Sequence, residues 1–262
     1  MTERLVDYRR TAGWLGANFL YFEQLSSTND HLLALGEQGA PEGTVVVADV
    51  QSRGRGRMQR RWLASPGTSL LMSLLFRPRP PFAFHASRAT MLCGLALVEA
   101  VTSLTALPVS LKWPNDLILE EGGRWKKVAG MLSEIGTAGN EPAFLVVGIG
   151  LNVTVPAGDL PRLSPNATSL SVELGRPVSR VALLGHFLEC AESLYGRMCL
   201  GWDPLSDWRA AISWLGRRVD VHTPTGVVTG IAEDVDAEGA LLLRALDGTL
   251  SRFPVGDVSL RI

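Results

Sequence analysis

The chain has 262 residues, 46% of them hydrophobic, which suits one large domain or one large and one small domain with packed cores. Its 25 lysines and arginines are offset by 26 aspartates and glutamates, so the net charge is −1. This balance excludes the overall basic field of a typical nucleic-acid-binding protein, and any anion site must come from local clusters of basic residues.

Several features predict a cytoplasmic protein with no membrane association. The first ten residues are charged and contain no apolar signal region. The most apolar stretch, residues 91–109, contains Glu99 and is broken by Pro108, which favours a core helix over a membrane span. Cys93, Cys190 and Cys199 lie in apolar stretches without Cys-x-x-Cys spacing, so we predict reduced core thiols. The histidines are scattered and show no metal-ligand spacing.

Residues 18–150 alternate between strand and helix patterns. Ser27 and Asp30 resemble a helix capping box, which predicts a helix start after the first strand. The other helix of this part is predicted at 84–104. Apolar or alternating runs predict strands at 18–24, 44–50, 69–76, 109–112, 117–119, 125–135 and 143–150.

The composition changes at Gly216. Before it, two amphipathic helices are predicted at 181–200 and 204–215. After it, short alternating runs separated by turn signals predict a small antiparallel barrel or sandwich of about five strands. We therefore expect two domains, residues 1–215 and 216–262.

The densest basic cluster is the arginine loop, residues 51–62, which carries five arginines and two glycines and follows a buried strand. Glycines let a backbone approach a ligand closely, and guanidinium forks suit phosphate or carboxylate. A flexible solvated loop and a nucleic-acid-binding arm are the alternatives. Against the nucleic-acid-binding arm, Trp62 is the one aromatic residue of the loop that could stack on bases. A dinucleotide fingerprint fits poorly, because Gln59 stands at its third glycine position and no helix pattern follows.

Other polar residues interrupt apolar strand patterns. Lys127 either points to solvent from an edge strand or faces inward and requires an anion. Lys112 and Asn115 flank a proline turn, and residues 148–152 (Gly-Ile-Gly-Leu-Asn) end a strand. No Ser-His-Asp order, Cys–His pair, carboxylate pair or metal cluster stands out. The remaining inventory suits electrostatic handling of a phosphate without a protein nucleophile.

Taken together, these motifs resemble the biotin–protein ligases (biotin–[acetyl-CoA-carboxylase] ligases). The resemblance covers roughly residues 18–262, and each motif is weak alone, but their shared order is specific. In chain order they are Ser27-Thr28-Asn29, Gln51, Gly54-Arg55-Gly56-Arg57 with Arg60 and Trp62, Lys112-Trp113-Pro114-Asn115-Asp116, Lys127-Val128-Ala129-Gly130, and Gly148-Ile149-Gly150-Leu151-Asn152.

The resemblance implies an α/β catalytic domain like that of class II aminoacyl-tRNA synthetases, with a mixed sheet, followed by a small SH3-like β-barrel. It also implies a two-step reaction. The carboxylate of biotin attacks the α-phosphate of Mg-ATP to give biotinyl-5′-AMP, and a lysine of a biotin carboxyl carrier domain then takes the biotinyl group. The cofactors would be ATP and Mg²⁺, with no metal ligand assigned to the protein.

The family pattern also implies roles for individual residues. Lys127 and Arg57 would be catalytic. Biotin would contact Ser27, Thr28, Asn29, Gln51, Gly54, Arg55, Gly56, Arg57 and Lys127. ATP or the adenylate would contact Arg57, Arg60, Trp62, Lys112, Asn115, Lys127 and Asn152. Asp116 is left as a brace.

Three further expectations follow from the family pattern. Gln59 replaces a family glycine, which puts closure of the arginine loop in question. Only about 17 residues precede the first strand, so we expect a monofunctional enzyme without a DNA-binding domain or nucleic-acid partner. The family often pairs through sheet edges, which leaves a homodimer open. The rival interpretations are a lipoate or octanoate ligase or transferase of the same fold, and an inactive biotin-binding protein.

Overall fold

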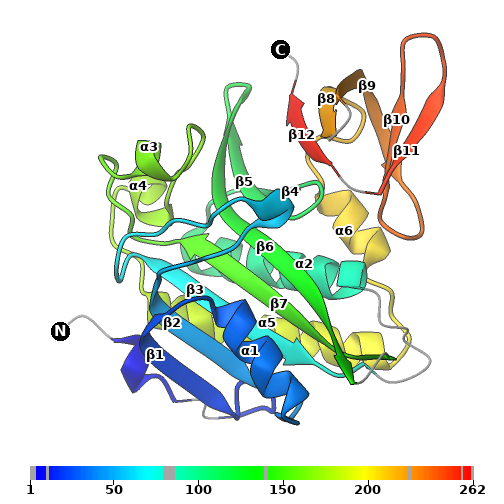
Figure 1. Ribbon diagram of the computed structural model, residues 1–262. Coiled ribbons are helices and arrows are strands. Elements are labelled where there is room, and N and C mark those ends of the chain that lie inside the picture. Colours follow the sequence, from blue (N-terminus) through cyan, green and yellow to red (C-terminus); the bar gives the residue numbers. More distant parts are fainter. Residues whose placement is uncertain are drawn as a thin grey trace.

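A seven-stranded sheet forms the centre of the protein, with the strand order β1-β2-β3-β7-β6-β5-β4 (Figure 1). The computed structural model describes residues 4–9, 12–78, 86–138, 141–223, 226–254 and 256–260. β1 and β2 are parallel and the other neighbouring pairs are antiparallel, so the sheet is mixed, as expected. The strands are β1 (Phe19–Leu25), β2 (Val45–Gln51), β3 (Ser69–Phe76), β4 (Val109–Lys112), β5 (Asp116–Glu121), β6 (Arg124–Ala138) and β7 (Glu141–Asn152).

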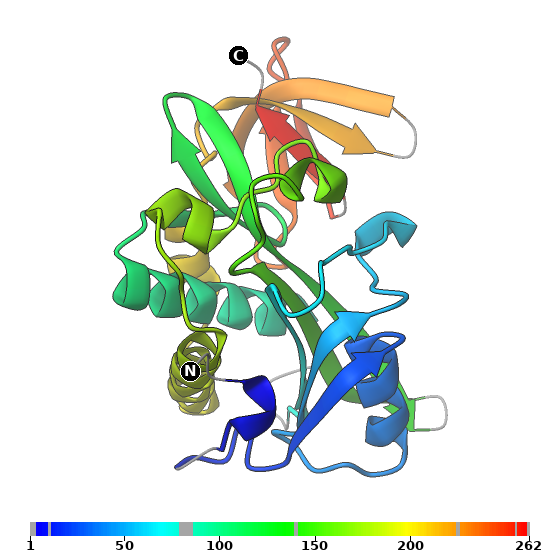
Figure 2. The same cartoon turned by 90° about the vertical axis from the view of Figure 1, so that its left-hand side faces the viewer.

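Helices cover both faces of this sheet. α1 (Thr28–Glu37) lies on one face, and α2 (Ala86–Thr105) and α5 (Arg180–Cys199) pack together on the other (Figure 2). Successive residues of β2 therefore enter different cores: Val46 packs under α1, while Val45 and Val47 join the larger core. Burial on both sides explains why β2 and β3 are continuous apolar runs.

A second, five-stranded sheet follows α6 (Leu205–Ala211), with the order β11-β10-β9-β8-β12 and antiparallel pairing throughout. Its strands are β8 (Arg218–Thr223), β9 (Gly226–Val235), β10 (Leu241–Arg244), β11 (Leu250–Phe253) and β12 (Asp257–Leu260). Short helical turns complete the chain: η1 (Leu5–Asp7), η2 (Arg57–Gln59), α3 (Leu160–Leu163) and α4 (Leu170–Leu174). The small all-β unit after Gly216 agrees with the change in composition.

Three expectations need correction or comment. The helix predicted at 204–215 ends at Ala211, because Ile212 bridges to Leu111 and the Ser213 N–H donates to the Leu111 carbonyl (3.1 Å). Cys93 and Cys190 are buried, but Cys199, the last residue of α5, is exposed, so the prediction of three core thiols was wrong. The predicted start of α2 at residues 84–85 lies outside the described residues.

Helix α2 is the core helix that the sequence predicted. Among the residues described, it alone has the length and apolar composition needed to cross a membrane. Leu92, Cys93 and Leu97 are nevertheless buried in the large core, and α2 packs against α5 and β6. Its apolar character is accounted for by this packing.

Candidate functional site

The arginine loop folds back on itself as a short hairpin. Arg55 and Arg61 form an antiparallel bridge, and the Gly56 N–H donates to the Arg60 carbonyl (2.7 Å). The Trp62 N–H donates to the Gly54 carbonyl (2.9 Å), and a Cβ on Gly54 would meet the Trp62 carbonyl at 2.5 Å. The glycine therefore permits the close approach of the two arms, and the loop has a defined shape.

The tip of this hairpin carries two residues with left-handed backbone. Met58 has φ +53° and Gln59 has φ +59°, a region that glycine adopts far more readily than other residues. Gln59 is the position at which the family pattern has glycine. The conformation that such a glycine would favour is thus present here despite the side chain.

Replacing Gln59 by glycine should stabilise the folded protein by about 1 kcal/mol, because left-handed backbone costs other residues roughly that amount. Gln59→Ala is the matched control, since it removes the side chain but keeps the backbone penalty. Thermal unfolding of both variants measures the difference. A Gln59→Gly variant less stable than Gln59→Ala would contradict this account of the hairpin tip.

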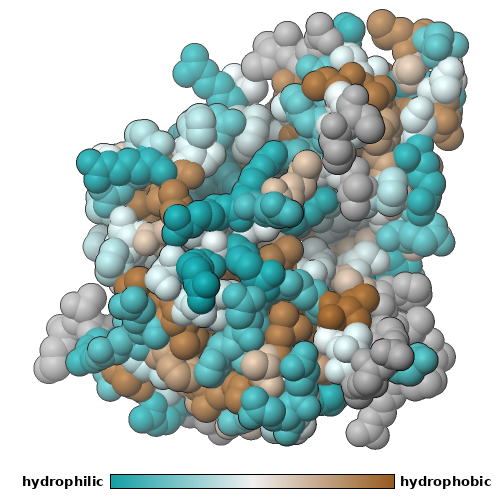
Figure 3. Space-filling model, in the orientation of Figure 1, coloured by the Kyte–Doolittle hydropathy of each residue, from teal (hydrophilic) through white to brown (hydrophobic). Residues whose placement is uncertain are grey.

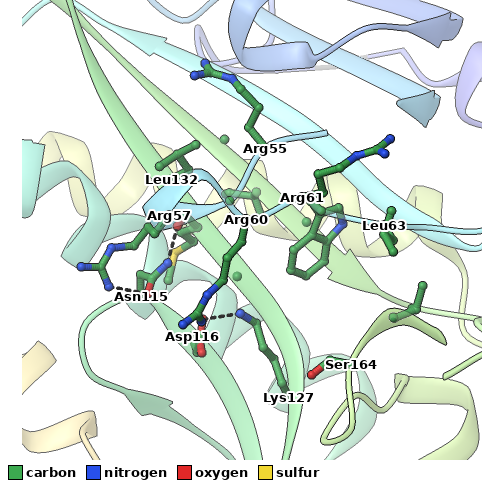
Figure 4. Close-up of a pocket in the computed structure, with 18 of the residues that line it drawn as sticks. Arg55, Arg57, Arg60, Arg61, Leu63, Asn115, Asp116, Lys127, Leu132 and Ser164 are labelled. Carbon is green, nitrogen blue, oxygen red and sulfur yellow. Dashed lines mark hydrogen bonds and ion pairs between the residues drawn. The ribbon is translucent and has the colours of Figure 1, made fainter. Parts of the chain in front are cut away.

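A pocket opens between this hairpin, the N-terminus of α1, strands β5 to β7 and the start of β12. Figure 3 shows hydrophilic residues gathered across the middle of this face, where Figure 1 places the hairpin. The pocket brings together most of the residues singled out from the sequence (Figure 4). They are Ser27, Thr28, Asn29, Gln51, Arg55, Gly56, Arg57, Arg60, Trp62, Asn115, Lys127 and Asn152.

Small polar groups occupy the end of the pocket near α1. Ser27 caps the helix, accepting from the Asp30 N–H (3.3 Å). The Gln51 side-chain oxygen accepts from the Thr28 N–H (2.7 Å) and from its hydroxyl (3.2 Å). Fixed donors and acceptors of this kind suit a neutral polar ring.

Asn29 is locked in the same region by strands that lie far from it in sequence. Its amide nitrogen donates to the Leu132 carbonyl (3.1 Å) and to Glu134 (2.8 Å), and its oxygen accepts from the Ser73 hydroxyl (2.6 Å). A Cβ at Gly148 would overlap the Asn29 carbonyl oxygen. Gly148 is therefore an interior position of β7 that leaves room for an amide, and the interpretation of 148–152 as a simple strand end was incomplete.

Trp62 lies across the middle of the pocket, over two other glycines. A Cβ at Gly150 would overlap its indole, and one at Gly130 would lie 3.0 Å from the ring. The Lys127 ammonium is 5.5 Å from the ring centroid, within cation–π range. The indole Nε1 is buried and, among the described residues, has no hydrogen-bond partner.

Cationic groups gather beyond the tryptophan. The Lys127 ammonium lies 2.6 Å from Asp116, the contact that a brace at Asp116 would make (Figure 4). Arg57 donates to two neutral acceptors, the Asn115 side chain (3.3 Å) and the Gly256 carbonyl (3.1 Å). Burial lowers the pKa of Arg57 from its ordinary value. Because its acceptors carry no charge, its positive charge is available to an anionic ligand.

Not every predicted residue faces the pocket. Lys112 is buried behind it and binds Asp116 (3.3 Å) and Asp257 (2.9 Å). Arg55 lines the pocket, but its guanidinium points outward and pairs with Asp30 (2.6 Å) and Glu134 (2.5 Å) (Figure 4). Asn152 lines the pocket but is held by the Thr168 carbonyl (3.0 Å).

The sequence did not single out several residues that shape the site. Glu134 and Ser73 fix Asn29, while Gly256 and Asp257 reach the pocket from the second sheet. Their partners lie 44 to 199 positions away in the sequence, so no local motif could reveal them. A buried serine within the apolar run 69–76 was the one local signal, because a buried hydroxyl requires a partner.

The sequence contains three lysines, and all of them are ion-paired at or beside this site. Lys112 and Lys127 share Asp116, as described above. Lys126 pairs with Glu173 of α4 (3.0 Å) on the outer side of β6. Apart from four histidines, the other basic side chains of the chain are arginines.

Comparison with known proteins agrees with this arrangement. Residues 21–152 match the Biotin/lipoate A/B protein ligase family, and residues 214–261 match the Biotin protein ligase C terminal domain. The bifunctional ligase/repressor BirA of Bacillus subtilis is 34% identical over 249 residues, covering 94% of this chain and 75% of that protein. The biotin–[acetyl-CoA-carboxylase] ligase of Mycobacterium tuberculosis is 36% identical, covering 90% and 86%.

A solved structure shows the same architecture. The biotin protein ligase from Aquifex aeolicus, in complex with biotin and ATP, superimposes with a TM-score of 0.75 at 28% identity. The match covers 93% of this chain and 98% of the Aquifex chain, so it includes both sheets.

Proposed function

Because the chain belongs to the Biotin/lipoate A/B protein ligase family, we propose that it attaches biotin to a lysine of a carrier protein, using ATP and a biotinyl-5′-AMP intermediate. One observation carries the proposal: a single pocket places a neutral polar end, a tryptophan and a group of cations in that order. This order matches the uncharged ring, the acyl chain and the charged phosphate of an acyl-adenylate.

In the first step a carboxylate oxygen of biotin attacks the α-phosphorus of ATP, and pyrophosphate leaves. Two anions must approach each other, so cations that stabilise the charge on the phosphate oxygens lower the barrier. We assign this role to Lys127 and Arg57. The polar end formed by Thr28, Asn29 and Gln51 would hold the biotin ring, and Trp62 would separate the ring from the adenine.

In the second step the ε-amine of the carrier lysine attacks the acyl carbon of the adenylate. The C–O bond to AMP breaks, AMP leaves with the bonding electrons, and the amine loses a proton to solvent. The carrier would be the biotin domain of acetyl-CoA carboxylase or of a related carboxylase, as the name of the M. tuberculosis relative suggests. Arg60 and Asn152 would hold the nucleotide until this attack.

Mg²⁺ is expected to arrive with the ATP phosphates. Among the described residues, no group of three histidines, cysteines or carboxylates could hold a metal ion. Asp116 and Asp257 are already paired with lysine or arginine. This donor set fits a cation that keeps most of its water and substrate ligands, and when bound it would supply additional neutralisation of the phosphates.

The remaining expectations stay proposals. We place the boundary between a catalytic domain and an SH3-like domain at residues 215/216, where the composition changes and the second sheet follows. A cytoplasmic location fits the reduced thiols. A homodimer would pair through β1, an edge strand of the large sheet, because residues 212–213 already pair with Leu111 at the other edge.

The decisive experiment incubates the protein with ATP, Mg²⁺, biotin and a biotin-carrier domain, and then probes the carrier with avidin. We expect labelling that depends on all four components. A carrier domain whose acceptor lysine is replaced by arginine should remain unlabelled. Lipoate and octanoate in place of biotin test the alternative acyl chain. Absence of labelled carrier, beside an active control ligase, would refute the proposed function.

A further inference from the structure

Asp257 is the point at which the second sheet, the arginine loop and the buried lysine meet. It is the first residue of β12, and its two carboxylate oxygens bind different partners. One oxygen accepts from Arg60 of the loop (2.6 Å), and the other accepts from Lys112 of β4 (2.9 Å). Burial by itself would raise the pKa of Asp257, but Lys112 and Arg60 hold it below its ordinary range, so the carboxylate is charged.

A continuous row of ion pairs runs from this carboxylate to the lysine assigned to catalysis. Lys112 also binds Asp116 (3.3 Å), and Asp116 binds Lys127 (2.6 Å). The signs alternate along the row from Arg60 through Asp257, Lys112 and Asp116 to Lys127. Lys112 and Asp116 are almost fully buried, so they are screened weakly and each depends on its neighbours for neutralisation.

We propose that Asp257 is a positioning residue with two effects, and that the second sheet completes the site through it. Through Arg60 it fastens the arginine loop over the pocket, beside the contact of Arg57 with the Gly256 carbonyl. Through Lys112 and Asp116 it sets the position of the Lys127 ammonium. The second effect rests on the proposed function, whereas the first is a property of the loop alone.

The two effects predict different results for two variants. Asp257→Asn keeps the size of the side chain but removes the charge, which should loosen the loop and also let Asp116 shift toward the unneutralised Lys112. Arg60→Ala removes the fastening and the proposed contact of Arg60 with the nucleotide, but Asp257 stays paired with Lys112. The Arg60 side chain is 63% exposed, so its loss leaves no buried charge unpaired. Both variants should therefore open the loop, and Asp257→Asn should in addition lower kcat for adenylate formation.

The chain offers a matched control. Asp234 of the second sheet pairs with Arg209 of α6, so it also joins the two parts of the chain, but it does not line the pocket. Asp234→Asn should leave both the loop and adenylate formation as they are in the parent protein. Asp257→Glu, which retains the charge, should recover most of what Asp257→Asn loses.

Limited trypsin digestion of the full chain measures how accessible the arginine loop is and does not depend on the activity of the protein. The loop contains five arginines at which trypsin can cleave. We expect Asp257→Asn and Arg60→Ala to be cleaved within residues 53–61 several-fold faster than the parent and Asp234→Asn proteins. The double variant should be cleaved no faster than either single variant, since all three break the same contact. Parent-like cleavage of Asp257→Asn, or additive effects in the double variant, would overturn the fastening role.

Biotin-dependent exchange of pyrophosphate into ATP measures the second effect, the positioning of the Lys127 ammonium. We expect kcat to fall about 10- to 100-fold in Asp257→Asn, the size expected for a displaced catalytic group. In Arg60→Ala the loss should instead appear mainly in KM for ATP. Equal losses in Asp257→Asn and Asp257→Glu, or an unchanged kcat in Asp257→Asn, would overturn the positioning of Lys127. A parent protein without exchange would refute the proposed function and leave the digestion result standing, and melting curves identify any variant that fails to fold.

Discussion

Lys127→Ala should lower the rate of adenylate formation by about 100- to 1000-fold, the usual effect of removing one preorganised group that stabilises developing charge. The Lys127 ammonium lines the pocket between Trp62 and Asp116, at the position where the carboxylate of biotin and the α-phosphate would meet. Without it, Asp116 would keep only Lys112 as an ion-pair partner and would repel the two anionic substrates more strongly. Biotin-dependent pyrophosphate exchange into ATP measures this step directly.

The neighbouring lysine is the control for this variant. Lys126 pairs with Glu173 and does not line the pocket, so Lys126→Ala should retain exchange close to that of the parent protein. Lys127→Arg should recover little activity, because a guanidinium is larger and planar and cannot replace a compact ammonium beside the indole. Exchange by Lys127→Ala at the rate of the parent protein would show that the first step is driven by other cations.

The second large effect is expected at Gly148, where alanine should remove biotin binding and destabilise the fold by about 2–4 kcal/mol. The added Cβ would overlap Asn29, which is buried and bonded to Ser73, Leu132 and Glu134. β7 cannot move away, because it is paired with β3 on one side and β6 on the other. Asn29 must then leave its hydrogen bonds or the sheet must distort.

Thermal unfolding and biotin titration of Gly148→Ala test this expectation. Gly158→Ala is the matched glycine control, since a Cβ there would meet no atom within 4 Å. The control should unfold and bind biotin as the parent protein does. If Gly148→Ala bound biotin normally, the polar end of the pocket would have to lie elsewhere than around Asn29.

The sequence was most informative where side-chain periodicity and local turns decide the structure. β3 and β4 have the predicted bounds because an apolar run and an alternating run, respectively, are each closed by turn residues. Ser27 caps α1 as the spacing to Asp30 predicted. The early end of helix α6 was not predicted. It is set by the pairing of residues 212–213 with Leu111, about 100 positions earlier, and no local sequence pattern shows such a contact.

The sequence predicted which residues belong to the site better than it predicted where the fold places their side chains. Lys127 alone could have faced solvent, and the family motifs suggested otherwise before the structure placed it beside Asp116. Lys112 shared those motifs, yet the fold buries it behind the pocket. The glycines at 130, 148 and 150 could be recognised in the sequence, but their purpose depends on Trp62 and Asn29 crossing β6 and β7 in three dimensions.

The placement of the three lysines has a chemical consequence for work with this protein. Amine-directed reagents would find, besides the α-amino group, only side chains that belong to the site or adjoin it. A surface that presents arginine instead of lysine also offers few acceptors to a reactive acyl-adenylate that escapes, since guanidinium groups remain protonated and are poor nucleophiles. Mass spectrometry after amine acylation would thus report almost entirely on Lys126 and Lys127, without a background from the rest of the surface.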